Sequence, residues 1–168
     1  MTSSPVARQT IDDLLAIAAI RQVKAAYCRF VDTKQWDRLR ALFTDDAKIE
    51  GSSLVADGSS VAEFIDGSSQ RFIDVVSIHH VHEPEIMLTG PNMARGCWPM
   101  SDYVEFLKGD PIVGRGWIGW GSYEEAYRRV DDEWRIAFMR IARFRVDAIT
   151  ADHPAFKPGR IPVTADWL

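Results

Sequence analysis

Residues 113–147 read VGRGWIGWGSYEEAYRRVDDEWRIAFMRIARFRVD, and this stretch decides the fold class. Two runs within it, 113–130 and 134–147, are rich in β-favouring residues and have apolar side chains at alternate positions, with a turn-forming DDE at 131–133 between them. Alternation with a period of two is typical of a β-strand. The stretch therefore predicts two long antiparallel strands joined by a tight turn.

The β-rich pattern extends back from this stretch to Phe72. Two more strands are predicted at 75–89 and 93–107, and each ends at turn-forming residues, GPN at 90–92 and KGDP at 108–111. The second half of the chain is therefore expected to form a run of long antiparallel strands.

The N-terminal part of the chain has helical periodicity instead. Thr10 begins a capping-box pattern, and apolar residues then recur at helical spacing over 10–31. A second helix fits 36–43, a short strand fits 48–50, and Ser60 is placed to cap a third helix. Three helices followed by long strands predict an α+β domain, in which the helices cover one face of a curved antiparallel sheet.

The chain of 168 residues has the usual size of one domain. We expect a flexible N-terminus at 1–9, a single domain over 10–150, and a C-terminal arm at 151–168 that lies over the surface or a partner subunit. No run approaches the roughly 18 apolar residues of a membrane span, and the N-terminus lacks an apolar signal core. These features favour a cytoplasmic protein.

The composition argues against several kinds of partner. The net charge is −4 and basic residues are interleaved with acidic ones, so no basic stripe is available for a nucleic acid. Glycine-rich phosphate loops are absent between strand and helix, and the two cysteines have no metal or redox spacing. We therefore predict no nucleic-acid partner, no membrane partner and no cofactor.

Alternation along the predicted strand 134–147 makes both of its faces largely apolar. One face would carry Trp134, Ile136, Phe138 and Phe144, and the other Ala137, Met139, Ile141 and Arg143. We expect one face to line a pocket with the helices and the other to meet a second subunit, which predicts a homo-oligomer, either a dimer or a trimer.

Three of the four histidines lie close together in the sequence, at His79, His80 and His82. On a strand, His80 and His82 share one face and His79 lies on the other, so at most two of them can meet one metal ion. Metal binding and an ordinary surface or core position are both open for His80 and His82, and we predict no metal site.

Three further polar residues stand at positions that need an explanation. Asp32 lies at the end of the first predicted helix, where an aspartate most often caps the following helix. Tyr27 lies on the apolar stripe of the first helix and by default belongs to the core. Arg143 lies among apolar side chains, so its charge needs either a protein partner or an anionic ligand.

The segment 27–39, YCRFVDTKQWDRL, resembles the SnoaL-like branch of the nuclear-transport-factor-2-like superfamily, and within it scytalone dehydratase and bile-acid 7α-dehydratase. Further matches are SIHHVHEPEI at 77–86, GWGSY at 119–123, and DDEWRIA at 131–137, followed by Arg143. The resemblance covers about residues 10–147 and implies a cone-shaped α+β barrel.

The resemblance implies catalytic roles for four residues. Asp32 and His79 match the aspartate and histidine with which these lyases remove a proton, so that His79 is the base and Asp32 orients its ring. Tyr27 matches a dehydratase tyrosine and Arg143 an arginine of the bile-acid enzyme, and either could stabilise negative charge on oxygen. The second active-site histidine of scytalone dehydratase has no counterpart here, because its neighbourhood falls at 102–104.

Strand alternation and the family pattern together place four large side chains toward the interior of the cone, namely Trp98, Met100, Trp117 and Tyr123. There they serve either as substrate-binding walls or as plain core. An aromatic pocket with few polar groups suits a small, hydrophobic, ring-bearing substrate.

These observations predict a cofactor-independent, dehydratase-like lyase that removes a proton with an Asp-His dyad and eliminates water or another β-leaving group. The same dyad also serves an isomerase or a retro-aldol lyase, because the substrate decides the outcome of the proton transfer. Two alternatives from other classes are a non-catalytic subunit, like the β subunits of ring-hydroxylating dioxygenases, and a ligand-binding cone.

Overall fold

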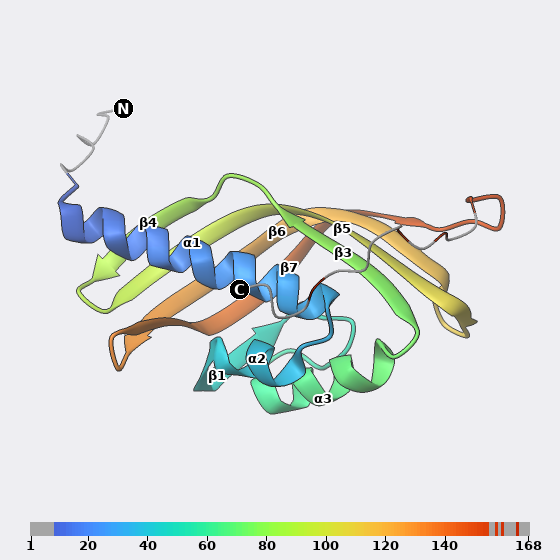
Figure 1. Ribbon diagram of the computed structural model, residues 1–168, viewed down its shortest axis with the longest axis horizontal. Coiled ribbons are helices and arrows are strands. Elements are labelled where there is room, and N and C mark those ends of the chain that lie inside the picture. Colours follow the sequence, from blue (N-terminus) through green and yellow to red (C-terminus); the bar gives the residue numbers. More distant parts are fainter. Residues whose placement is uncertain (1–8, 155–156, 158, 160–163, 165–168) are drawn as a thin grey trace.

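In the part of the chain that the structure describes, seven strands form one curved, open sheet, and helix α1 runs across one of its faces (Figure 1). The computed structural model describes residues 9–154, 157, 159 and 164. The helices are α1 (Ile11–Asp32), α2 (Trp36–Ala41) and α3 (Val61–Arg71). The strands are β1 (Phe43–Glu50), β2 (Ser59–Ser60), β3 (Val75–Val81), β4 (Glu85–Gly90), β5 (Met93–Asp110), β6 (Gly114–Val130) and β7 (Glu133–Ala148).

The predicted α+β class and the three N-terminal helices are confirmed, with one correction to the sheet. The strand order is β2-β1-β7-β6-β5-β3. Strand β4 is outside this order and pairs with β5, as β3 does. Every strand pair is antiparallel except β1 with β7, which runs parallel. We call the sheet face toward α1 the inner face, because it carries the core.

The last turn of helix α1 lies against the inner face of the sheet. It starts at a capping box formed by Thr10 and Asp13, as predicted, and it buries Ile20 among other residues of one stripe. It ends at Asp32, and Lys34 then takes a φ of +60°, a left-handed conformation in which a helix cannot continue. The chain therefore turns away just after the carboxylate of Asp32 has reached the sheet.

Three predicted elements differ in their boundaries from the structure. Helix α2 ends at Ala41, and β1 begins at Phe43, well before the strand expected at 48–50. The backbone N–H of Ile136 donates to the Leu42 carbonyl at 2.8 Å, so pairing with the distant strand β7 draws this segment into the sheet. The strand expected at 75–89 is two strands, β3 and β4, because the chain breaks at Pro84, which has no N–H to donate.

A β-bulge overturns the predicted alternation along β7. Tyr127 pairs with Ile136 and Ala126 pairs with Phe138, so Ala137 is the extra residue and the side chains from Phe138 to Arg143 change face. Trp134 and Ile136 therefore share the inner face with Met139, Ile141 and Arg143, whereas Phe138 lies on the other face. Phe144 is the extra residue of a second bulge, because Gly121 pairs with Arg143 and Trp120 pairs with Arg145.

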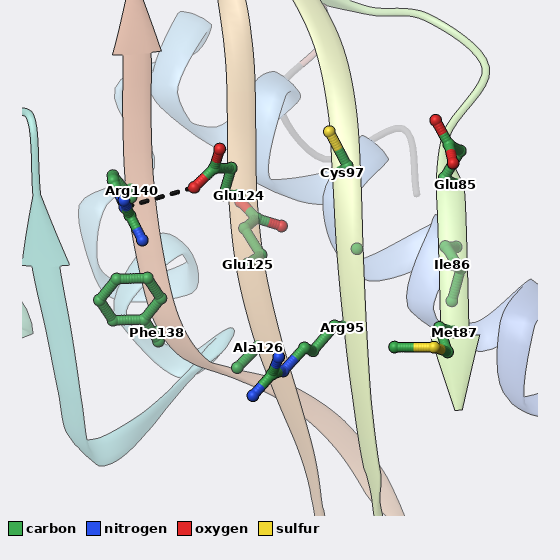
Figure 2. Close-up of a pocket in the computed structure, with 11 residues that line it drawn as sticks. Glu85, Ile86, Met87, Arg95, Cys97, Glu124, Glu125, Ala126, Phe138 and Arg140 are labelled. Atoms are coloured by element: carbon green, nitrogen blue, oxygen red, sulfur yellow. Dashed lines mark ion pairs between the residues drawn. The ribbon is translucent and has the colours of Figure 1, made fainter. Parts of the chain in front are cut away.

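The opposite, outer face of the sheet is mixed and not largely apolar as expected. It bears a hollow of about 760 Å³ on strands β4 to β7, shown in Figure 2 with α1 behind the sheet. Arg140 lies 3.4 Å from Glu124 and 3.5 Å from Glu50 across this face. None of the eight site residues named from the sequence lines this hollow.

The two terminal segments lie mainly outside the described residues. Of the N-terminus expected at 1–9, only Gln9 is described. At the start of the arm expected at 151–168, the His153 carbonyl accepts a hydrogen bond from Arg115 at 3.0 Å, so this part lies against its own chain. Among the helices of the described part, none is long and apolar enough to cross a membrane.

Candidate active site

A cavity of about 260 Å³ lies between the inner face of the sheet and the helices. Its walls come from α1, α3, the loop after β1 and strands β3, β5, β6 and β7, and they are mainly apolar. The lining residues are Tyr27, Val31, Gly51, Ser52, Ser53, Leu54, Phe64, Ser68, Phe72, His79, Asp102, Val104, Val113, Trp117, Tyr123, Ile141, Arg143 and Val146. A small apolar enclosure with a few clustered polar groups is the usual form of a small-molecule site.

Asp32 and His79 form a two-point contact at one side of this cavity. The Asp32 carboxylate lies 2.6 Å from His79 Nδ1 through Oδ1, and its Oδ2 accepts the His79 backbone N–H at 2.8 Å. Because a carboxylate can only accept, Nδ1 is the nitrogen that carries the hydrogen when the ring is neutral. His79 lines the cavity, and Nε2 is the ring nitrogen that is not bonded to Asp32.

Asp32 does not cap the helix that follows it. The N-cap position of α2 is Gln35, and no side chain hydrogen-bonds there. The alternative favoured by residue spacing alone is therefore wrong, and the structure brings Asp32 and His79 together.

Of the two partners expected for the charge of Arg143, a protein group or an anionic ligand, the structure shows a protein group. Its two terminal nitrogens donate to the two carboxylate oxygens of Asp102 at 2.7 and 2.6 Å. The Asp102 side chain is 1% exposed. Burial lowers the pKa of Arg143, but pairing with Asp102 more than offsets this, so the pKa is raised overall.

Asp102 is the site residue that sequence reasoning missed. It pairs with His79 between β3 and β5, in the region where the resemblance lacked a second histidine. Gly119 pairs with it on β6, and a Cβ atom at Gly119 would overlap both Asp102 Oδ1 and Arg143 Nη1. A glycine within a strand often marks such a close approach, so GWGSY at 119–123 carried a usable signal.

Tyr27 and Tyr123 form the aromatic wall beside Arg143. Their rings meet edge to face with centroids 5.7 Å apart, and both line the cavity. Burial raises the pKa of both phenols well above the ordinary value, so at neutral pH each hydroxyl is a neutral donor and not a base. Trp117, also predicted for the pocket, lines it too.

Trp98 and Met100 do not line the cavity, in line with the alternative of plain core. Trp98 points to the inner face as expected, but its indole N–H donates to the Tyr127 hydroxyl at 2.9 Å inside the core. Met100 places its sulfur 4.0 Å from Arg143 Nη1. The reason is that the inner face is longer than the cavity, and core packing fills the rest.

His80 and His82 are exposed, in line with the ordinary surface position. Over the part of the chain that the structure describes, no group of three or more histidine, cysteine, aspartate or glutamate side chains is placed to hold a metal ion.

A buried ionic network lies behind the aromatic wall. Lys24 and Glu125 have fully buried side chains, and Lys24 Nζ lies 2.5 Å from Glu125 Oε1. The same ammonium lies 3.3 Å from the ring centroid of Tyr123 and 4.2 Å from that of Tyr27. The Tyr127 hydroxyl donates to Glu125, which continues the network. Cation–π contacts of this kind help to hold the two cavity tyrosines in place.

Lys34 is a second cation near the dyad. Its Nζ donates to Ser77 Oγ at 2.7 Å and lies 5.0 Å from the ring centroid of Phe72, a residue of the cavity wall. Burial lowers the pKa of Lys34 to about 8, and the nearby charge of Asp32 opposes this only in part.

The lowered pKa of Lys34 predicts that the free energy of unfolding rises with pH. Between the folded pKa of about 8 and the ordinary value of 10.5, the unfolded chain holds a proton that the folded chain has lost. Below that window both states are protonated and the cost of burying the charge is fully present. From about pH 7 to about pH 9.5, the melting temperature of wild type should therefore rise relative to that of Lys34→Met.

The matched control is Lys108→Met, since Lys108 is an exposed lysine paired with Asp74 at 2.6 Å. Its difference from wild type should stay nearly constant over the same range. A difference between wild type and Lys34→Met that does not change with pH would contradict a neutralised Lys34.

Known proteins resemble this chain in sequence and in fold. A family model for the SnoaL-like domain matches residues 12–140. A protein named as a probable cyclase, FGR4, from Gibberella zeae is 25% identical over 138 residues, which is 76% of this chain and 91% of that protein.

Two solved structures share the fold at lower sequence identity. One is a hexachlorocyclohexane dehydrochlorinase, LinA type 2, with a TM-score of 0.75 and 18% identity over 90% of this chain and 99% of the other. A protein named as a putative scytalone dehydratase, from Novosphingobium aromaticivorans, has a TM-score of 0.74 and 16% identity, over 88% of this chain and 96% of the other. The curved sheet, the three helices and the matching family model agree, and the chain belongs to the SnoaL-like domain family.

Proposed function

We propose that this protein is a cofactor-independent lyase, which removes a proton from a carbon atom and expels a leaving group from the neighbouring carbon. The observation that carries the proposal is the pairing of Asp32 with His79 Nδ1 at 2.6 Å, which leaves Nε2 for a molecule in a cavity with aromatic walls. The substrate is a small hydrophobic molecule that bears a ring, because the walls are largely apolar.

In the first half of the reaction, His79 is the base and the carbonyl group of the substrate takes up the negative charge. His79 Nε2 takes a proton from the carbon next to a carbonyl, and the electron pair of the broken C–H bond moves onto the carbonyl oxygen as an enolate. Asp32 stabilises the imidazolium that forms. The Tyr27 hydroxyl and the guanidinium of Arg143 line the same cavity and can donate to the negative oxygen.

The second half of the reaction restores the enzyme. The enolate electrons form the carbon–carbon double bond, and the C–O bond to the β-hydroxyl breaks with its electron pair. The imidazolium of His79 gives its proton to the departing hydroxide, so water leaves and the ring is neutral again.

The named relatives support a lyase without assigning a substrate. Two of the structural relatives are named for the loss of water and of hydrogen chloride, both of which are eliminations. The sequence relative is named as a cyclase, so bond formation after the same proton transfer is the second candidate.

The experiment that tests the proposal monitors β-hydroxy ketones, hydroxylated steroid thioesters and aromatic diols in deuterated, metal-chelated buffer by NMR. We expect loss of the β-substituent from at least one compound. Deuterium incorporation with a shifted double bond or a new ring would assign an isomerase or a cyclase instead, and loss of all activity on chelation would contradict cofactor-independent chemistry.

A further inference from the structure

The guanidinium of Arg143 lines the cavity, and its charge is paired with a carboxylate of the protein itself. Among the described residues that line the cavity, Arg143 is the sole arginine or lysine. An arginine at the edge of an apolar pocket commonly binds a carboxylate through two parallel hydrogen bonds. Here Asp102 already makes both of these bonds, at 2.7 and 2.6 Å.

The pair between Arg143 and Asp102 is built into the sheet and is not a loose surface contact. Asp102 is on β5 and Arg143 on β7, and the strand between them contributes Gly119, the position at which a Cβ atom would overlap both groups. The Asp102 side chain is 1% exposed, so its charge depends on Arg143 for compensation. Separating the two would leave a buried carboxylate unpaired.

The charge balance of the site is set by this pairing. A carboxylate ligand that enters beside Arg143 would meet the negative charge of Asp102 and would gain no uncompensated cation in return. An uncharged carbonyl avoids this cost. A guanidinium has five N–H groups, and the two hydrogen bonds to Asp102 leave others to donate to a neutral oxygen.

We propose that Asp102 determines charge specificity, so that the site takes a substrate with an uncharged carbonyl group at the Arg143 end and rejects the corresponding acid. This deepens the proposed function and rests on it, because it assumes that the cavity is the substrate site. Asp102 acts through Arg143 as a specificity-determining residue.

The primary test compares two ligands of the same shape, 2-naphthamide and 2-naphthoate, by calorimetry at neutral pH. Wild type should bind the amide at least about tenfold more tightly than the acid, which corresponds to about 1.4 kcal/mol. Asp102→Asn releases Arg143 and should reverse this preference. Asp74→Asn, which removes an exposed carboxylate paired with Lys108, should behave as wild type.

A second measurement does not depend on whether naphthyl compounds fit the cavity. Asp102→Ala leaves Arg143 without its carboxylate, and added formate can then occupy the vacant position. Formate should raise the melting temperature of Asp102→Ala in a saturable manner and should leave wild type and Asp74→Ala unchanged. The amide analogue, formamide, should give no such rescue.

Two results would overturn the proposal: wild type that binds naphthoate as tightly as naphthamide, or formate that stabilises Asp102→Ala no more than wild type. Neither measurement requires turnover. Charge selectivity with no elimination from any substrate would therefore refute the lyase and leave the specificity role intact, and elimination without charge selectivity would do the reverse.

Discussion

Replacement of His79 by alanine is expected to lower turnover of any substrate of this protein by at least about a hundredfold, because a positioned general base contributes about that much or more. Asp32→Asn should also cause a large loss. An amide can present its NH₂ group to Nδ1, which would stabilise the tautomer with the hydrogen on Nε2 and remove the base from the cavity.

The matched control for these variants is His80→Ala. His80 is the next residue along β3, but its side chain is exposed and does not line the cavity. It should keep the turnover of wild type. Circular dichroism spectra should show that all three variants are folded, and turnover by His79→Ala at the wild-type rate would contradict the role of His79 as base.

The largest expected effect on stability comes from the buried network behind Tyr27 and Tyr123. Lys24→Met leaves the carboxylate of Glu125 fully buried without its cation, and such a change costs about 3–5 kcal/mol of unfolding free energy. The double variant Lys24→Met/Glu125→Gln removes both charges and keeps an acceptor for the Tyr127 hydroxyl. It should recover most of the lost stability.

Chemical denaturation of both variants measures this difference, with Arg21→Met as the control. Arg21 lies one turn earlier on α1 and pairs with Glu83 at 2.8 Å, but both side chains are well exposed. Its loss should cost under about 1 kcal/mol. A cost for Lys24→Met as small as that for Arg21→Met would contradict a buried pair with uncompensated charge.

Local patterns in the sequence were enough to predict most of the elements. The helix over 10–31 and the strands over 93–107 and 113–130 were within a few residues of α1, β5 and β6, because capping, periodicity and turn chemistry act over short distances. The parallel addition of β1 to β7 was not predicted, because it joins segments far apart in the chain.

The candidate site shows the same division. Asp32 and His79 were identified from the family resemblance, whereas from residue spacing alone Asp32 looked like a helix cap. Arg143 was identified as a charge in need of a partner, but Asp102 was not identified as that partner. Asp102 is on β5 and Arg143 is on β7. The two residues meet only because β5, β6 and β7 are neighbours and Gly119 leaves room between them.

The sequence by itself determined the α+β class, the family, and which side chains are able to move a proton, since these depend on residue type and short-range pattern. The tertiary structure decided which way those side chains point and what they contact. The bulge at Ala137 put Arg143 on the inner face, and pairing across strands placed Asp102 beside His79 and against Arg143. The physical reason is that face and partner are set by register and packing between distant segments, which no local pattern encodes.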